Sequence, residues 1–240
     1  MQKKLSLGFA TLLCIQGAVA EEDSFKGEGK LGLTNTSGNT ETQTIVGNLK
    51  LGYTMFKWEH EAKLETLRAE DGQNLTAERY SLDLQSDYKL PNKISYLWGN
   101  FRYEDDKFSG YNYQTALTVG YGHKVIDTAR TKLDLEAGVG IRKSELKAGS
   151  EPNDDLDREP IARFGLDYSQ EISSNLDFTQ NFLVETGSEN THLESRTGFN
   201  VKIVGNLKMG LSLDINHNTE VPPGTEKTDT ITAVNLLYSF

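Results

Sequence analysis

Cysteine is almost absent from this chain of 240 residues, and its single copy, Cys14, lies very near the start. The first residues carry two lysines, an apolar stretch from Leu5 to Ile15 and the small residues Ala18-Val19-Ala20, which is the pattern of a secretory signal. We therefore predict that residues 1–20 are a cleaved signal peptide and that Cys14 is removed with it. A mature chain without cysteine excludes disulfide bonds as the force that holds the fold together.

Long hydrophobic runs and an excess of basic residues are also missing. After the signal no stretch approaches the roughly 18 apolar residues of a membrane-spanning helix, which excludes that class of membrane protein. The formal net charge is −10, and because the signal carries two lysines and no acid, its removal lowers this to about −12. An acidic chain without a basic stripe argues against a nucleic-acid partner. The four histidines are scattered without metal-ligand spacing, so we expect no metal and no cofactor.

The main pattern in the chain is the alternation of apolar and polar residues. From Gly27 onward, segments of roughly ten residues alternate apolar with polar side chains, which is the period of a β-strand. One such segment has apolar residues at every second position: Leu133, Leu135, Ala137, Val139 and Ile141. A helix would need apolar spacings of three and four, so we predict an all-β chain. We expect about twelve strands, near 28–34, 42–54, 57–68, 77–88, 94–104, 112–125, 131–143, 160–170, 176–186, 192–204, 207–217 and 230–240.

The lengths of the expected strands and connections favour one architecture. Strands in soluble folds average about five or six residues, whereas roughly 9–11 residues cross a bilayer at a tilt. An even strand number, short turns at one end and longer polar loops at the other are typical of bacterial outer-membrane barrels. We predict a single up-and-down antiparallel transmembrane β-barrel over 27–240 in the Gram-negative outer membrane, after a short periplasmic segment at 21–26. The alternative is a soluble periplasmic β-barrel or sandwich that binds a small ligand.

The last seven residues, VNLLYSF, are predicted to form the strand that closes the barrel. Apolar side chains occupy alternate positions and end on an aromatic residue: Val234, Leu236, Tyr238 and Phe240. We expect this strand to pair with the one near Gly27, because every strand in lipid needs two neighbours. The terminal aromatic resembles the C-terminal signal that the barrel-assembly machinery reads. The expected partners are therefore this machinery, outer-membrane lipid and lipopolysaccharide.

The opposite face of the strands carries charges of both signs. The candidate lumen charges are Glu59, Glu61, Glu65, Arg79, Asp83, Arg102, Glu104, Asp134, Glu136 and Arg142. They could pair across the interior and plug it, or they could line a water-filled path, since twelve strands fall between packed eight-stranded barrels and open sixteen-stranded porins. We expect an envelope-structural protein or a narrow, weakly cation-selective passive pore.

Three further patterns point to chemistry only weakly. His192 with Glu194, or His217 with Asp214, would suit a hydrolase with an active site at the barrel rim, but no nucleophile stands in a recognisable motif, so we expect no enzyme. The acidic loop 150–159 could collect Ca²⁺ or Mg²⁺, although it lacks EF-hand spacing. The glycines of 120–122 and 138–140 fall on the lumen side, where we expect them to make room for large side chains opposite.

Several of these segments also carry a family resemblance. The loop TSGNT at 36–40, the stretch RYEDDKFSGY at 102–111, GYG at 120–122 and GVG at 138–140 occur in an order and spacing that resemble the family of salt-induced outer membrane proteins. The resemblance covers essentially the whole mature chain. It implies an outer-membrane barrel and offers no catalytic residues to carry over.

Overall fold

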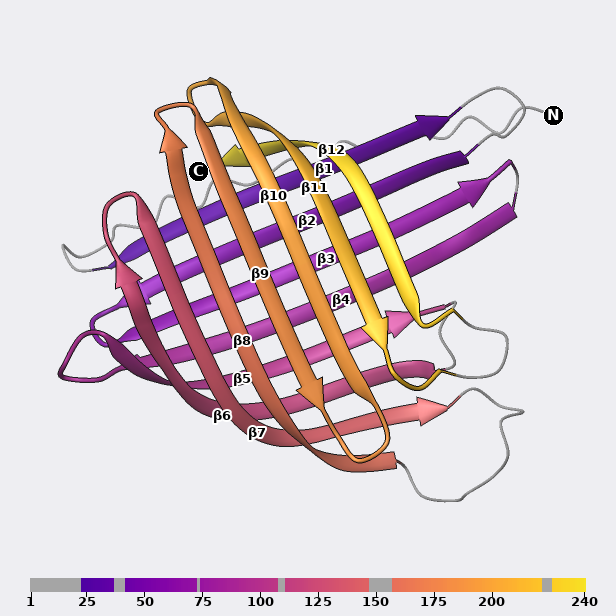
Figure 1. The fold of residues 1–240 in the computed structure, drawn as a ribbon, viewed down its shortest axis with the longest axis horizontal. Coiled ribbons are helices and arrows are strands. Elements are labelled where there is room, and N and C mark those ends of the chain that lie inside the picture. The colour runs from indigo at the N-terminus through magenta and orange to yellow at the C-terminus, as the bar shows by residue number, and fades with distance from the viewer. Residues whose placement is uncertain (1–22, 37–41, 73, 108–110, 147–156, 222–225) are drawn as a thin grey trace.

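The chain forms a closed barrel of antiparallel strands in a computed structural model (Figure 1). The structure describes residues 23–36, 42–72, 74–107, 111–146, 157–221 and 226–240, so the predicted signal peptide at 1–20 lies outside it. The strands are β1 (Ser24–Thr36), β2 (Thr42–Met55), β3 (Trp58–Asp71), β4 (Asn74–Lys89), β5 (Ser95–Asp106), β6 (Tyr111–Asp127), β7 (Thr131–Leu146), β8 (Asp157–Ser173), β9 (Leu176–Thr186), β10 (Thr191–Val204), β11 (Leu207–Asn218) and β12 (Thr228–Ser239). In the described part of the chain, no helix is long and apolar enough to cross a membrane.

The predicted class, strand number and up-and-down order are confirmed. Each strand pairs with its neighbours in sequence, and β1 closes the ring on β12. Apart from β9, which has the expected bounds, the strands are longer than the alternation indicated. For example, β1 begins at Ser24, inside the segment expected to precede the barrel, because its ladder with β2 continues to Ser24↔Thr54. Alternation marks only the part of a strand that faces an apolar medium, whereas backbone pairing continues beyond it into the rims.

The barrel exposes its large apolar side chains and buries its charges. Outward residues such as Leu117, Val139 and Leu211 are 55%, 64% and 52% exposed. Inward Arg142 and Glu185 are only 4% and 2% exposed. A soluble barrel would show the reverse, because a continuous apolar surface of this kind is unfavourable in water. The alternative of a soluble periplasmic fold is therefore wrong, and the chain is an outer-membrane β-barrel.

Strand β1 begins and strand β12 ends at the rim that carries the short turns. The first residues of β1 pair with the end of β2, and a tight turn then leads from Met55 to Trp58. Aromatic side chains gather at this rim, including the edge-on pair of Trp58 and Tyr88, whose ring centroids are 5.1 Å apart. An aromatic girdle marks a membrane interface, and short turns are typical of the periplasmic end of such barrels. The opposite rim is therefore extracellular.

The seam between β1 and β12 closes the barrel where it faces lipid. The strands pair from Glu28↔Ser239 to Leu33↔Val234, and the backbones of Gly27 and Phe240 exchange two hydrogen bonds of 2.8 Å. Only glycine fits at position 27, because a Cβ there would overlap the Phe240 ring. The expected pairing of the last strand with the one near Gly27 is confirmed.

The C-terminal side chains Val234, Leu236, Tyr238 and Phe240 all point outward and are between 41% and 55% exposed. The Phe240 ring lies 6.4 Å from the rings of both Phe25 and Tyr238. Whether the assembly machinery reads these residues stays a prediction. We expect Phe240→Ser to reduce sharply the amount of barrel inserted in the outer membrane, measured as heat-modifiable protein on gels of the membrane fraction.

The matched control is Phe56→Ser, which removes an outward aromatic at the same rim but away from the seam. Phe56 is 71% exposed, and its loss should leave insertion near the level of the unchanged protein. Equal insertion of the Phe240 variant and the control would contradict a special role for the terminal aromatic.

The outward and inward faces should also respond differently to charge. Leu211 is at the centre of the outward run Leu207–Ile215, and it pairs with Phe199. Leu211→Arg should lower the free energy of unfolding by roughly 2–4 kcal/mol, the cost of a charge near the bilayer midplane. Asn200→Arg, on the inward face of the neighbouring strand, should cost less than half as much. Urea unfolding in lipid vesicles measures both, and equal losses would contradict the assignment of faces.

Candidate functional site in the barrel lumen

The inward face of β5 fills the middle of the lumen. Strand alternation sends Tyr96, Trp98, Asn100 and Arg102 inward one after another, and the first three are 5%, 3% and 1% exposed. The two rings lie over glycines of β6 and β7. A Cβ at Gly120 or Gly138 would overlap the Trp98 ring, and one at Gly122 would overlap Tyr96. The prediction that these glycines make room for large side chains is confirmed for Gly120, Gly122 and Gly138, whereas a Cβ at Gly140 would meet Leu117 backbone and Thr118.

The central contact across the lumen is built on Glu194 of β10. One carboxylate oxygen of Glu194 accepts hydrogen bonds from Arg102 of β5 and, at 2.9 Å, from His192 Nε2. The other oxygen accepts from Arg196 Nη2 at 3.0 Å, and Arg196 in turn pairs with Glu65 of β3. In the ring order β4 lies opposite β10, and β3 and β5 are the two neighbours of β4, so these ion pairs span the barrel.

Two further groups of contacts join inward faces of strands that lie one to three positions apart in the ring. Arg163 of β8 donates to Asn100 Oδ1 at 2.9 Å and pairs with Glu185 at 3.3 Å, while its guanidinium lies 5.3 Å from the centre of the Trp98 ring. Glu136 of β7 accepts hydrogen bonds of 2.9 Å from both Tyr96 of β5 and Gln85 of β4. Buried charges in a low dielectric are stable only when paired and hydrogen-bonded, and these contacts meet that requirement.

A small cavity lies beside this network. Towards the extracellular rim, Arg142 donates to Glu159 and to the Asn190 carbonyl oxygen, the latter at 2.6 Å. The cavity between Arg142, Arg102 and His192 has a volume of about 20 Å³. A single water needs roughly 10–15 Å³ measured in this way, so the cavity holds a water and no solute.

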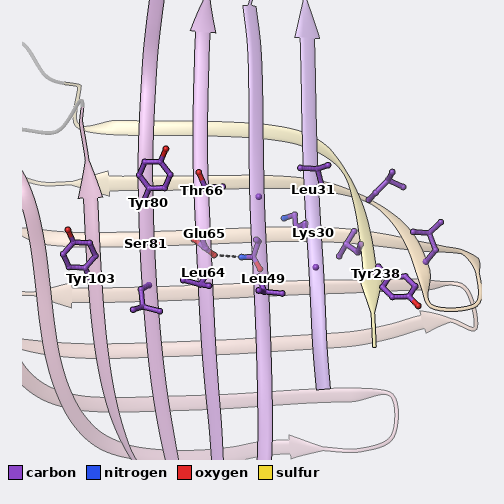
Figure 2. Close-up of a pocket in the computed structure, with 17 residues that line it drawn as sticks. Lys30, Leu31, Leu49, Leu64, Glu65, Thr66, Tyr80, Ser81, Tyr103 and Tyr238 are labelled. Carbon is purple, nitrogen blue, oxygen red and sulfur yellow. Dashed lines mark hydrogen bonds between the residues drawn. The ribbon is translucent and has the colours of Figure 1, made fainter. Parts of the chain in front are cut away.

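A second, larger hollow lies mainly on the outside of the barrel. It has a volume of about 780 Å³ and runs over β12 and β1–β5. Most of its lining belongs to the outward set of side chains: Leu31, Leu49, Leu64, Tyr80, Leu82, Tyr103, Leu236 and Tyr238. Figure 2 shows it beside the Asn48–Glu65 hydrogen bond of 2.7 Å. It is thus mainly an apolar groove in the lipid-facing wall, although the inward residues Lys30, Asn48, Glu65, Ser81 and Leu237 also line it.

Comparisons with known proteins agree with this architecture. Residues 29–240 match the family described as "Protein of unknown function, DUF481". The chain belongs to the DUF481 family. It is also 25% identical, over 219 residues, to "Uncharacterized protein YdiY" of Escherichia coli (strain K12), which covers 90% of this chain and 83% of that protein. The resemblance to the salt-induced outer membrane protein family is thereby confirmed.

Solved barrels share the fold of this DUF481 member at low sequence identity. The COG4313 outer membrane channel from Pseudomonas putida F1 gives a TM-score of 0.52 at 11% identity, covering 94% of this chain and all of that one (100%). The NanC porin gives a TM-score of 0.51 at 11% identity, covering 90% and 98%. At this identity the likeness shows the fold alone.

The ten predicted lumen charges all lie on inward faces, but they form several separate groups. Glu65, Arg102 and Glu104 join the central network, with Glu104 3.4 Å from Arg102. Glu136 and Arg142 belong to the other contacts described above. Of the remaining five, Arg79 of β4 faces Asn216 of β11 across the lumen, at 3.1 Å once the Asn216 amide is oriented to accept. The other four lie along the walls: Glu61 contacts Lys50 at 2.7 Å and Lys63 at 2.9 Å, Glu59 contacts Lys89 at 3.3 Å, Asp83 accepts from Asn100 at 2.9 Å, and Asp134 lies on the inward face of β7.

Sequence reasoning missed the neutral part of the lumen. The parity of Arg102 also places Tyr96, Trp98 and Asn100 on the inward face of β5. The glycines on the neighbouring strand, which were expected to face large side chains, are the pattern from which these residues could have been predicted. Of the two acid–histidine pairs considered for a rim hydrolase, His192 and Glu194 do meet. His217 and Asp214 point to opposite faces of β11, because residues three apart on a strand have opposite parity.

The acidic loop lies mostly outside the described residues. Of 150–159 only Asp157, Arg158 and Glu159 are described, all within β8, and the Glu159 side chain is engaged by Arg142. Within the ranges that the structure describes, no three or more His, Cys, Asp or Glu side chains are grouped as metal ligands. Divalent-cation binding at this loop stays a prediction.

The central network should contribute strongly to stability. Glu194→Gln keeps the shape of the side chain and removes the charge that faces Arg102 and Arg196. Removing one partner of a buried ion pair costs roughly 3–5 kcal/mol in free energy of unfolding. The control Glu104→Gln removes a carboxylate that touches Arg102 only at 3.4 Å, and it should cost about 1 kcal/mol or less. Urea unfolding in vesicles that shows equal losses would contradict the central position of Glu194.

Proposed function

We propose that this barrel is a structural component of the outer-membrane envelope whose lumen is closed at mid-height. The proposal rests on a chain of ion pairs that runs from Glu65 through Arg196 and Glu194 to Arg102. In Figure 1 the wall of β8–β12 lies in front of the wall of β1–β5, and this chain joins the two. Side chains that bridge opposite walls leave no continuous path for a solute of ordinary size.

Any current through the lumen should be small and weakly cation-selective. Towards the periplasmic rim, the Gln85 amide bridges two carboxylates, donating to Asp87 at 3.1 Å and to Glu136 at 2.9 Å. Glu59 lies near the same rim, 3.3 Å from Lys89 and 4.0 Å from Lys124. Fixed carboxylates lower the energy of a passing cation and raise that of an anion. An excess of acids in the mature chain supports the same sign of selectivity.

We infer that the barrel is not an enzyme. His192, the histidine paired with an acid, is fully engaged, because Nε2 meets Glu194 and Nδ1 lies 3.0 Å from Asn218 Oδ1. A serine does approach another histidine, with Ser95 Oγ 3.1 Å from His123 Nδ1. Ser95 is only 2% exposed and its hydroxyl also contacts Asn92 and Tyr121, so it is poorly placed to attack a substrate.

Single-channel recording in planar bilayers tests this proposal. Purified wild-type protein should give no steps of porin size. The double variant Glu194→Ser with Arg196→Ser removes one charge of each sign from the bridge, and we expect it to raise conductance several-fold by opening the middle of the lumen. Its residual cation preference should fade as salt rises, because ions screen fixed charge over about 10 Å at 0.1 M.

The matched control is Asp177→Ser with Lys208→Ser. This inward ion pair joins β9 and β11, which flank the same strand without spanning the lumen, so its loss should leave conductance unchanged. A wild-type barrel with large steady steps would contradict the closed lumen. An unchanged conductance in the Glu194 and Arg196 double variant would show that this bridge is not what closes it.

A further inference from the structure

Two basic side chains face each other on the outer surface of the barrel. Lys143 of β7 and Arg158 of β8 are directly opposed in the strand register. Both share the outward parity of Ile141, which is 53% exposed. Cβ atoms of directly opposed residues are roughly 4.5–5.5 Å apart, and like charges at that distance destabilise a sheet. An anion between the two charges would relieve this repulsion.

The pair lies at the extracellular edge of the band of apolar outward side chains. On its periplasmic side, the outer face of β7 carries Leu135, Val139 and Ile141, which are 41%, 64% and 53% exposed. Lys143 is the next outward residue, on the side away from the short periplasmic turns. This is the level at which the apolar core of the outer leaflet ends and its polar headgroups begin.

The immediate surroundings suit an anion. Lys143 Nζ donates to the Tyr113 hydroxyl at 3.0 Å and lies 5.4 Å from the centre of that ring, which stacks on Tyr103 with centroids 6.0 Å apart. These contacts fix the ammonium at the surface without neutralising it. In the described part of the chain, neither Lys143 nor Arg158 forms an ion pair with an acid. Glu145 is the next outward residue of β7, and its carboxylate accepts from Asn112 at 3.2 Å.

Another outward cation at the same rim is arranged differently. Arg68 of β3 lies 2.6 Å from Glu70 and 3.7 Å from Glu78, and Lys107 also contacts Glu78. The chain thus supplies its own acids to the basic side chains over β3–β5. Within the ranges that the structure describes, no acid pairs with Lys143 or Arg158, so a negative group from outside these ranges can lie between them.

We propose that Lys143, Arg158 and Tyr113 bind a phosphate group of an outer-leaflet lipid. The Arg158 guanidinium offers a planar fork of donors, Lys143 adds a compact charge, and the Tyr113 hydroxyl can donate a further hydrogen bond. A phosphate between the two cations relieves their repulsion. The acyl chains of the same molecule would lie along Ile141 and Val139, on the periplasmic side of the pair. A lipid phosphate therefore fits this position better than free inorganic phosphate.

Lipid binding to the full-length barrel in detergent tests the proposal. The probe is the bisphosphorylated lipid anchor of lipopolysaccharide, titrated against wild-type protein and the double variant Lys143→Gln with Arg158→Gln. Each basic residue near an anionic surface contributes about 1 kcal/mol, so the double variant should bind roughly thirtyfold more weakly. Arg68→Gln removes one outward charge that already has acidic partners, and it should leave the affinity unchanged.

Two further titrations separate the possible sources of the anion. The dephosphorylated lipid should bind wild-type protein as weakly as the phosphorylated lipid binds the double variant, and inorganic phosphate should bind far more weakly than the phosphorylated lipid. Heat-modifiable migration of the double variant checks that it is folded. Unchanged lipid affinity in the folded double variant, or equal affinity for the dephosphorylated lipid, would overturn the site. Inorganic phosphate that binds as tightly as the lipid would overturn the lipid as its ligand.

Discussion

The need to pair every backbone polar group inside lipid determines this structure. In the apolar part of a bilayer no water is present to satisfy a free N–H or C=O group, so a sheet is stable there only if it closes on itself. The seam between β1 and β12 provides this closure from Gly27↔Phe240 to Leu33↔Val234, over the part of both strands whose outward side chains are apolar or glycine. Before Val234, towards the start of β12, the outward residues are threonines, and this part of the strand pairs with β11 alone.

Closure then determines the chemistry of the interior. Strand alternation sends one residue of every two inward, and twelve strands enclose a space only moderately wider than a packed barrel. Charges confined there must be paired, since burying an unpaired charge is far more costly than burying a pair. Arg102, Arg163 and Arg196 are long enough to reach across to Glu194, Asn100 and Glu65. The same contacts that satisfy these charges therefore close the lumen.

Much of the fold could be predicted from the sequence, because parity and strand length follow directly from the period of two. The inward direction of Glu65 and Arg102 followed from the same rule. Their partners did not, since Arg102 meets Glu194 and Arg196 meets Glu65 across 92 and 131 residues of sequence. Which walls face each other depends on ring order, strand tilt and register together. Strand ends were also underestimated, because β1 and β8 continue as paired backbone after their apolar alternation stops.

The central claim is that side chains from opposite walls are coupled through the lumen. A double-mutant cycle on Glu65→Gln and Arg196→Gln measures this coupling directly, from the unfolding free energies of both single variants and the double variant in lipid vesicles. Residues in direct contact show interaction energies of about 0.5–3 kcal/mol, and we expect a favourable value in the upper half of that range. Additive effects of the two substitutions would contradict the account, because they would mean that Glu65 and Arg196 do not meet across the barrel.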